Sequence, residues 1–310
     1  MELPPEETLR WVVRIYAQIR SARKRTVDIP RLVQPDSEFF PDEFHHDMTG
    51  LERLLDRMAG YAPIGDHVNF VIGLLDQGEG EACGTGAACG CSHDDGPSER
   101  SGRVEASPGG YRVWLRPKDA GRPETLTTVL ARAIGAVVLE ESAIEADDQR
   151  SELAAVANGF GVLLMNGAAV WGKSCGGLRM TRATALTVEE LAVALALFGG
   201  LHGTPPSRIR KHLGTTQRAA FDVAHEWVES NPMMIEALRD RPGILEGGMF
   251  DLEPVRGVIG RWLHRRQLQR ELKAVPAQRS DSSMTEDKRR RLREARALVD
   301  EVMSASESEE

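Results

Sequence analysis

Four side chains that could bind a metal ion lie close together in one glycine-rich segment. Their spacing is C-x5-C-x-C-x-H, and they are Cys83, Cys89, Cys91 and His93. Thiolate sulfur and imidazole nitrogen are ligands that zinc prefers, and four of them complete a tetrahedral site. The spacing differs from the Cys-x-x-Cys pair of common zinc modules, and glycine-rich inserts are often simply flexible. The segment therefore predicts either a zinc site or a flexible loop with free thiols.

A second candidate is the sequence HEWVE, which runs from His225 to Glu229. It is similar to the HExxH motif of zinc hydrolases but ends in glutamate, so a hydrolytic metal site would need His225 and Glu229 as non-standard ligands. The apolar residues Phe221, Ala224 and Val228 repeat around it at helical spacing. That repeat indicates a buried helical stripe, which makes a structural role the alternative.

The elements that would position these groups are mostly helices. Residues 67–75 and 111–115 are rich in β-branched and aromatic side chains and predict strands. Elsewhere apolar residues recur at the spacing of one helix face, over residues 6–19, 51–58, 123–138, 149–165, 187–201, 216–230 and 252–274. We therefore expect a helix-rich α+β fold with a small sheet near residues 67–116.

The chain is expected to form one domain over residues 1–275. Residues 78–110 are polar and glycine-rich, and their number exceeds the ~15 residues of an ordinary connection, so we interpret them as an inserted surface loop. Residues 276–310 carry blocks of like charge and few apolar side chains. This composition predicts a charged, largely disordered tail.

Charge and hydropathy exclude several classes of protein. The 310 residues contain 39 basic and 47 acidic side chains, a net charge of -8, which makes nucleic acid an unlikely partner for the folded body. No apolar run reaches the ~18 residues that cross a bilayer, and the acidic start MELPPEETLR does not resemble a signal peptide. We therefore expect a cytosolic protein. The arginine-rich segment 255–273 could contact an anionic partner, and the alternative is a solvated basic helix face.

Three stretches carry a longer pattern of helices and short motifs: LARAIGAVVLEE, DDQRSELAAVANGFGVLLMNGAAVW and LTVEELAVALALFGGLHGTPPSRIRKHL. With the earlier FFPDEF they resemble a group of bacterial proteins that are similar to zinc-dependent peptidases of the zincin type. The resemblance covers roughly half of the chain. It implies a zincin-like minidomain whose first helix bears His-Glu-x-x-His and whose next segment supplies an acidic ligand.

The metal-binding residues of that pattern are absent from this chain. When LARAIGAVVL is aligned on its apolar and small residues, the two histidine positions hold Arg132 and Ala136, and the glutamate position holds Ala133. Arginine is a cation and alanine has no donor atom, so neither can ligate zinc. The resemblance therefore implies a degenerate, non-catalytic relative, a pseudoenzyme with no metal in this cleft.

The acidic part of the pattern is retained. Asp148 falls near the position of the acidic ligand, and Glu152 lies one turn further on the same helix face. Because a buried carboxylate without a partner is costly, we expect the guanidinium of Arg132 to occupy the vacated site and to pair with Asp148 or Glu152. The alternative is that all three side chains are ordinary solvent-facing charges.

The sequence thus predicts a binding protein whose partner is another protein, contacted through the former cleft or the charged termini. Two alternatives remain open. One is a metal-dependent hydrolase that uses His225 and Glu229 or the cysteine cluster. The other is a protein that binds metal at the Cys/His loop, where zinc is the one cofactor that the sequence suggests.

Overall fold

The computed structural model describes residues 2–22, 30–64, 68–75, 101–174 and 177–255, without the side chains of residues 171–179. All of them belong to one compact unit, Met1–Arg256. The remaining unit, Gly257–Glu310, lies outside the described residues, as do most of the expected insert and the expected basic helix. The domain boundary expected at residue 275 therefore stays a prediction.

The fold is helix-rich α+β, as the sequence predicts. Its first half contains α1 (Glu6–Ala22), α2 (Met48–Ala59), β1 (Asn69–Leu74), β2 (Arg103–Ser107), β3 (Gly110–Leu115), α3 (Pro117–Ala120) and α4 (Pro123–Glu141). Then follow α5 (Asp148–Ala155), a π-helical turn (Val156–Phe160), α6 (Gly161–Gly167), β4 (Val170–Ser174) and β5 (Gly177–Thr181). The last elements are α7 (Val188–His202), α8 (Pro206–Arg210), α9 (Thr215–Ser230), α10 (Pro232–Asp240) and α11 (Gly243–Glu246).

The three-stranded sheet has the order β1-β3-β2, with β1 parallel and β2 antiparallel to β3. Both predicted strands are present. The chain turns sharply between β2 and β3, where Gly109 has φ +83°, a conformation that favours glycine. The strand β2 lies inside the segment that was expected to be a loop, so that expectation was wrong for residues 103–107. The short alternation Arg-Val-Glu-Ala-Ser is too weak a signal to separate a strand from a polar loop.

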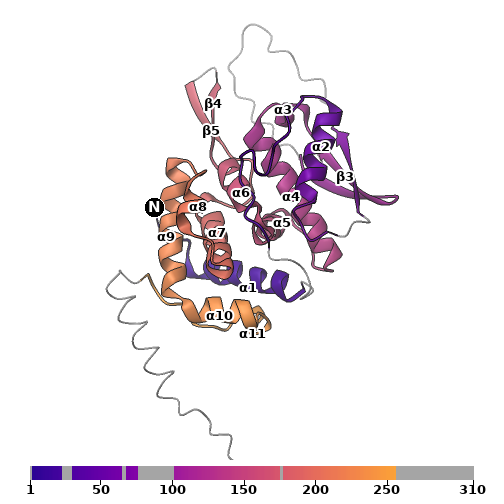
Figure 1. The fold of residues 1–310 in the computed structure, drawn as a ribbon. Coiled ribbons are helices and arrows are strands. Elements are labelled where there is room, and N and C mark those ends of the chain that lie inside the picture. Colours follow the sequence, from indigo (N-terminus) through magenta and orange to yellow (C-terminus); the bar gives the residue numbers. More distant parts are fainter. Residues whose placement is uncertain (1, 23–29, 65–67, 76–100, 175–176, 256–310) are drawn as a thin grey trace, which may run out of the picture. The chain divides into compact units, whose positions relative to one another are not determined.

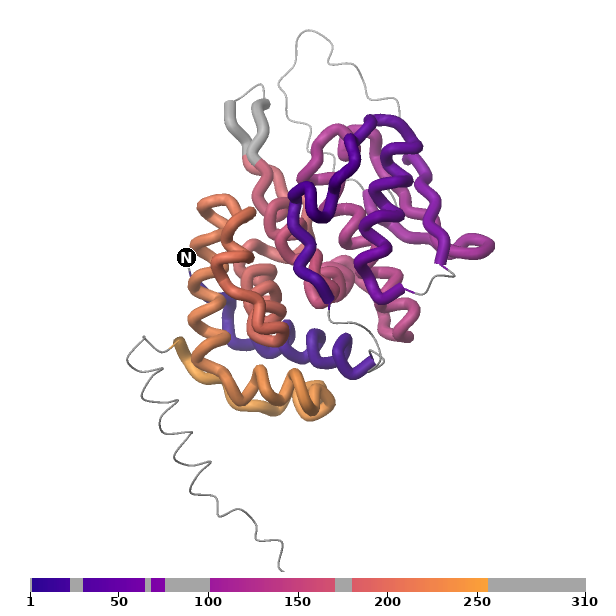
Figure 2. Tube along the Cα trace, in the orientation of Figure 1, coloured from indigo at the N-terminus to yellow at the C-terminus, as the bar shows by residue number. Residues whose placement is uncertain are grey.

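The helix α4 is the structural centre of this half of the chain. It contacts α2, α5 and α6 as well as β2 and β3 (Figure 1). At the other end of the described chain, α11 packs against α1, so the first and last helices lie side by side (Figure 2). The core is thus closed by contacts between segments that are distant in the sequence.

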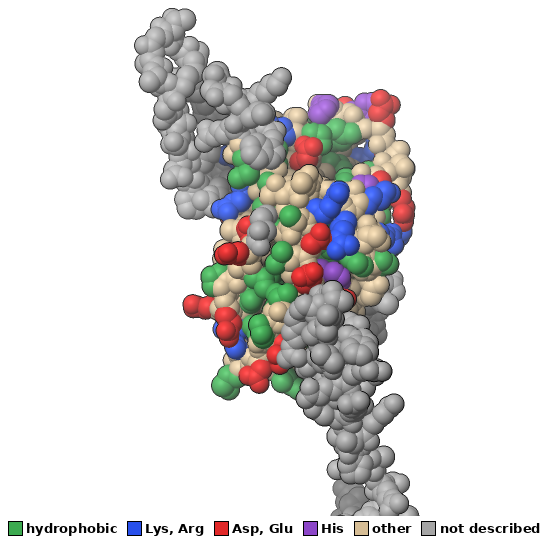
Figure 3. Space-filling view, turned by 90° about the vertical axis from the view of Figure 1, so that its left-hand side faces the viewer, with side chains coloured by type: hydrophobic (Ala, Val, Ile, Leu, Met, Phe, Trp, Pro, Cys, Tyr) green, Lys and Arg blue, Asp and Glu red, His purple; other side chains and the backbone are tan. Residues whose placement is uncertain are grey.

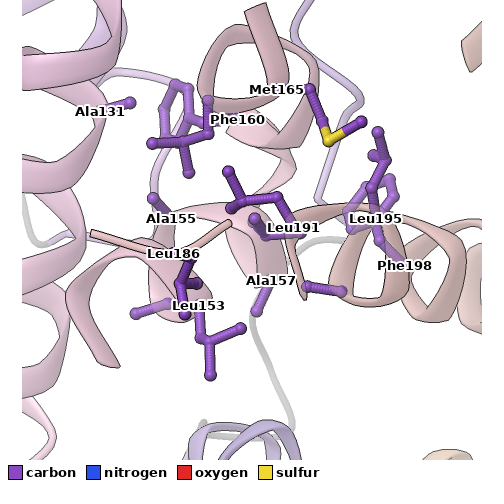
Figure 4. Close-up of a cluster of buried hydrophobic side chains, with 14 of the residues drawn as sticks. Ala131, Leu153, Ala155, Ala157, Phe160, Met165, Leu186, Leu191, Leu195 and Phe198 are labelled. Atoms are coloured by element: carbon purple, nitrogen blue, oxygen red, sulfur yellow. The ribbon is translucent and has the colours of Figure 1, made fainter. Parts of the chain in front are cut away.

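The apolar helix α7 is central, as its sequence predicts. All residues from Leu191 to Phe198 are buried, and they pack with side chains of α5, α6 and Leu186 (Figure 4). Thr187 and Glu190 form a capping box at the start of α7, because the Thr187 hydroxyl accepts from the Glu190 amide while the Glu190 carboxylate accepts from the Thr187 amide. This cap fixes where the chain turns from the 183–187 segment into the core.

The helix predicted over residues 149–165 is not continuous. It breaks at a π-helical turn in which Gly159 has φ +97°. A Cβ atom at Gly159 would lie 1.9 Å from the carbonyl oxygen of Arg31, and the Gly159 carbonyl accepts a hydrogen bond from the amide of Val33 at 2.9 Å. A distant segment therefore occupies the space that a regular helix would fill. Helical periodicity does not detect such a break, since the apolar pattern continues through it.

The hairpin of β4 and β5 was not predicted, nor were the short helices α8, α10 and α11. In the hairpin, antiparallel pairing runs from Val170 opposite Thr181 to Ser174 opposite Gly177. Its sequence alternates poorly and contains several glycines, which weakens any strand signal. The hairpin leads directly into the 183–187 segment that borders the site described below.

Gly135 permits the close contact between α4 and α5. A Cβ atom there would lie 2.0 Å from the carbonyl oxygen of Ser151, so we expect Gly135→Ala to force the two helices apart and to lower the free energy of unfolding by about 1–3 kcal/mol. Denaturant unfolding measures this change. In the matched control Gly121→Ala the nearest atom is 3.9 Å away, and the change should stay within about 0.5 kcal/mol. Equal effects of the two substitutions would contradict this account.

We expect the free energy of unfolding to fall at alkaline pH because of Tyr111. Burial raises the pKa of its phenol from 10 to about 12, with help from the hydrogen bond to the Glu141 carboxylate at 3.0 Å. The folded state thus holds this proton more tightly than the unfolded state does. The resulting stabilisation is complete below pH 10 and is lost as the pH rises from 10 to about 12. Unfolding curves across this range should show the loss in the native protein and not in Tyr111→Phe, and tyrosinate absorbance identifies the titrating group.

Candidate functional site

The expected ion pair of Arg132 is present, and its partner is Glu152. The Nη1 atom of Arg132 on α4 lies 3.4 Å from Oε1 of Glu152 on α5. Arg132 is 9% exposed and Glu152 is fully buried. Asp148, the other expected partner, lies exposed in the first turn of α5. The alternative of solvent-facing charges is therefore wrong for Arg132 and Glu152 and correct for Asp148.

Each member of the pair also binds backbone groups of other segments. Arg132 donates from Nη1 to the carbonyl oxygen of Ala183 at 3.0 Å and from Nη2 to the carbonyl oxygen of Ser101. Glu152 accepts from the amides of Ala185 at 2.7 Å and Leu186 at 2.9 Å. The pair therefore ties α4 and α5 to Ser101, two residues before β2, and to the 183–187 segment.

Burial raises the pKa of Glu152, and the donors from Leu186, Arg132 and Ala185 lower it only in part. Glu152 is fully buried and is not part of the cleft wall, and three donors bind its oxygens, so a ligand in the cleft would not contact this carboxylate. The geometry is that of a structural carboxylate.

Of the three α4 positions that align with His-Glu-x-x-His, only Arg132 lines a cleft. Ala133 is buried in the core, and Ala136 is half-buried and not part of the cleft wall. The small residue Gly135 lets α5 approach closely enough for Glu152 to meet the guanidinium. The local sequence of α4 thus serves both the helix contact and the pair.

The cleft beside Arg132 has a volume of about 920 Å³ and is strongly charged. Its lining includes the carboxylates of Asp119, Asp147 and Asp148. It also includes five cationic side chains, which are Arg116, Lys118, Arg122, Arg132 and Arg182. Most of these residues carry no signal in the sequence, because they come from α3, α4, the start of α5 and the segment after β5, which only the fold brings together.

A second, smaller cleft of about 450 Å³ involves the FFPDEF segment. Phe40 and Phe44 from that segment line it together with Leu54 of α2 and Leu126 of α4. Its surface is mainly apolar, and the ionisable side chains at it are Asp36, Asp42, Glu43, Arg53 and Arg57. The charged cleft is the stronger candidate for a functional site.

The candidate ligands His225 and Glu229 lie on α9. The Nε2 atom of His225 is 3.9 Å from Oε1 of Glu229, and its ring stacks on Phe221 with centroids 5.7 Å apart. The expected buried stripe of Phe221, Ala224 and Val228 is present. Within the described ranges, no three His, Cys, Asp or Glu side chains are grouped so that they could hold a metal ion.

The four ligands of the cysteine cluster, Cys83, Cys89, Cys91 and His93, lie outside the described residues. Zinc binding at that segment therefore stays a prediction.

The face of the molecule in Figure 3 shows a group of basic side chains close to acidic ones. Basic residues near α8 are paired in this way: Arg210 is bonded to Asp222 on α9, and Arg208 lies 4.0 Å from Glu38. Such exposed pairs contribute little to stability and leave no net charge to attract a ligand. The charged cleft differs because its cations outnumber its carboxylates.

Comparison of the chain with protein-family models, with curated proteins and with solved structures finds no match. The zincin resemblance therefore rests on the motifs alone. In the part of the chain that the structure describes, no helix is both long enough and apolar enough to cross a membrane.

We expect Arg132→Ala to lower the free energy of unfolding by about 3–5 kcal/mol, because it leaves the buried Glu152 carboxylate without its cation. Denaturant unfolding measures this. The matched control is Arg150→Ala, whose partners Glu145 and Asp147 are 85% and 52% exposed, and its effect should be about 1 kcal/mol or less.

The double variant Arg132→Met/Glu152→Leu tests whether the hydrogen bonds between the pair and the backbone contribute to stability. An isolated buried ion pair can be replaced by apolar residues without loss. Here the backbone groups of Ser101, Ala183, Ala185 and Leu186 would lose their partners, so stability should recover only in part. Full recovery would show that these backbone bonds contribute nothing.

Proposed function

We propose that this protein is a cytosolic, non-catalytic binding module, a degenerate relative of zincin-type peptidases that retains the cleft as a binding site for another protein. One observation carries the proposal. The position that corresponds to the first zinc-binding histidine holds Arg132, which forms the floor of an open charged cleft while its own donors are used by Glu152, Ala183 and Ser101.

This arrangement supports binding more than hydrolysis. The guanidinium of arginine stays protonated at all physiological pH values, so Arg132 can act neither as a general base nor as a metal ligand. Glu152 accepts three hydrogen bonds inside the protein and has no route to a substrate water. The remaining cleft side chains are suited to recognising charge on a ligand.

The competing function is a metal-dependent hydrolase, and the test combines metal analysis with an assay of general peptidase activity. We expect the purified full-length protein to show no peptidase activity that a chelator abolishes. Zinc that is lost in Cys83→Ser/Cys91→Ser and retained in the control Cys175→Ser would assign metal binding to the cysteine cluster, and is compatible with the proposal. Zinc that persists in Cys83→Ser/Cys91→Ser, together with chelator-sensitive activity, would refute it.

A loss of that activity in His225→Ala would then identify the α9 pair as the metal site. Thr216→Ala is the matched control on the same helix, because Thr216 is exposed and lies outside the HEWVE sequence.

A further inference from the structure

The charged cleft is electropositive although the protein as a whole is acidic. Its lining has five cationic side chains against three carboxylates, and because Glu152 offsets Arg132 an excess of one positive charge remains, whereas the chain carries a net charge of -8. A concave site lined by one excess sign of charge concentrates ligands of the opposite sign. The cleft therefore favours an anionic partner.

Part of this charge is already used inside the protein. The Nε atom of Arg116 lies 2.9 Å from Asp119, and Arg132 is paired with Glu152. Asp147 caps α5 by accepting from the amide of Arg150 at 2.7 Å. These interactions shape the cleft walls.

Two arginines on the cleft wall are exposed, and in the described ranges neither is paired with a carboxylate: Arg122 and Arg182. They come from different elements, since Arg122 immediately precedes α4 and Arg182 immediately follows β5. The amino end of the 19-residue helix α4 has no side-chain cap, so its dipole adds positive potential beside Arg122. A ligand between the two walls would meet both guanidinium groups.

The dimensions of the cleft indicate an extended ligand. Its wall follows α4 from Arg122 through Thr125 and Val129 to Arg132, a distance of roughly 15 Å at 1.5 Å per residue. An extended peptide rises about 3.3 Å per residue, so four or five residues would span this wall. The exposed guanidinium groups of Arg122 and Arg182 stand on separate elements of the cleft, so they match carboxylates of separate peptide residues better than the compact charge of a single phosphate.

We propose that the charged cleft binds an extended acidic segment of a partner protein, whose carboxylates pair with Arg122 and Arg182. This inference rests on the proposed function and adds the chemistry of the partner. Arg132 remains bonded within the protein and supplies the floor of the cleft. Carboxylates are the expected ligands because each exposed guanidinium can bind one in a bidentate geometry.

The test measures binding of a fluorescent peptide of alternating glutamate and serine to the full-length protein by anisotropy. We expect saturable binding that weakens as salt is added, and no binding of the same peptide with glutamine in place of glutamate. Arg122→Ala/Arg182→Ala should weaken binding about tenfold, since two exposed ion pairs are removed. The control Arg112→Ala/Arg241→Ala removes two exposed arginines outside the cleft and should bind within about twofold of the native protein.

Charge reversal provides a rescue. Arg122→Glu/Arg182→Glu should lose the glutamate peptide and gain affinity for the matching lysine peptide, a change that a loss of folding would not produce. Equal affinities of the cleft variant and its control would overturn the inference. Inorganic pyrophosphate that binds tighter than the peptide and displaces it would also overturn it, in favour of a phosphate site.

The same samples separate this inference from the proposed function. If the peptide is recovered intact by mass spectrometry but does not bind, the inference of an acidic ligand is contradicted. The proposed function as a non-catalytic binding protein is then unaffected. A peptide that is cleaved in a chelator-sensitive reaction would contradict the proposed function itself.

Discussion

The buried ion pair of Arg132 and Glu152 is the interaction on which the arrangement of this cleft depends. Moving two charges out of water costs several kcal/mol each, and their attraction alone seldom repays that cost. Here four backbone groups complete the coordination of the two side chains, so each charge is bonded on more than one side. These hydrogen bonds help to hold the segments of Ser101 and residues 183–186 beside α4 and α5. The pair therefore determines the shape of the cleft as well as the contact between α4 and α5.

A second constraint makes the pair geometrically feasible. Gly135 of α4 allows the carbonyl of Ser151 on α5 to approach where a Cβ atom would stand. Arg132 lies about one helical turn before Gly135, and Glu152 directly follows Ser151, so the close contact of the two helices brings these side chains within reach of each other. The small residues that make LARAIGAVVL similar to a zincin helix thus have a packing role of their own in this chain. The small residues of this helix can be explained by the zincin resemblance or by helix packing, and the structure shows the packing at Gly135.

Sequence periodicity predicted the helices whose apolar faces are long and regular, such as α4 and α7, and it predicted the strands β1 and β3. It failed at Gly159, where a backbone contact with Arg31 from far along the chain breaks a helix whose apolar pattern continues. At the site, the pairing of Arg132 with Glu152 follows from helix register and from the cost of burying charge. The bonds to Ser101 and Ala183 could not be foreseen, because backbone carbonyls carry no residue-specific signal and lie 31 and 51 residues away from Arg132.

An arginine in this position differs physically from a bound metal ion. A metal site gains or loses its central charge with metal supply and with protonation of its ligands, so a cleft built around it changes with conditions. The guanidinium of Arg132 is part of the chain and stays charged at any physiological pH. Its two carbonyl contacts and its carboxylate contact are therefore permanent features of the folded state. A floor bonded in this way is formed before any ligand arrives, and a preformed site loses less conformational entropy on binding.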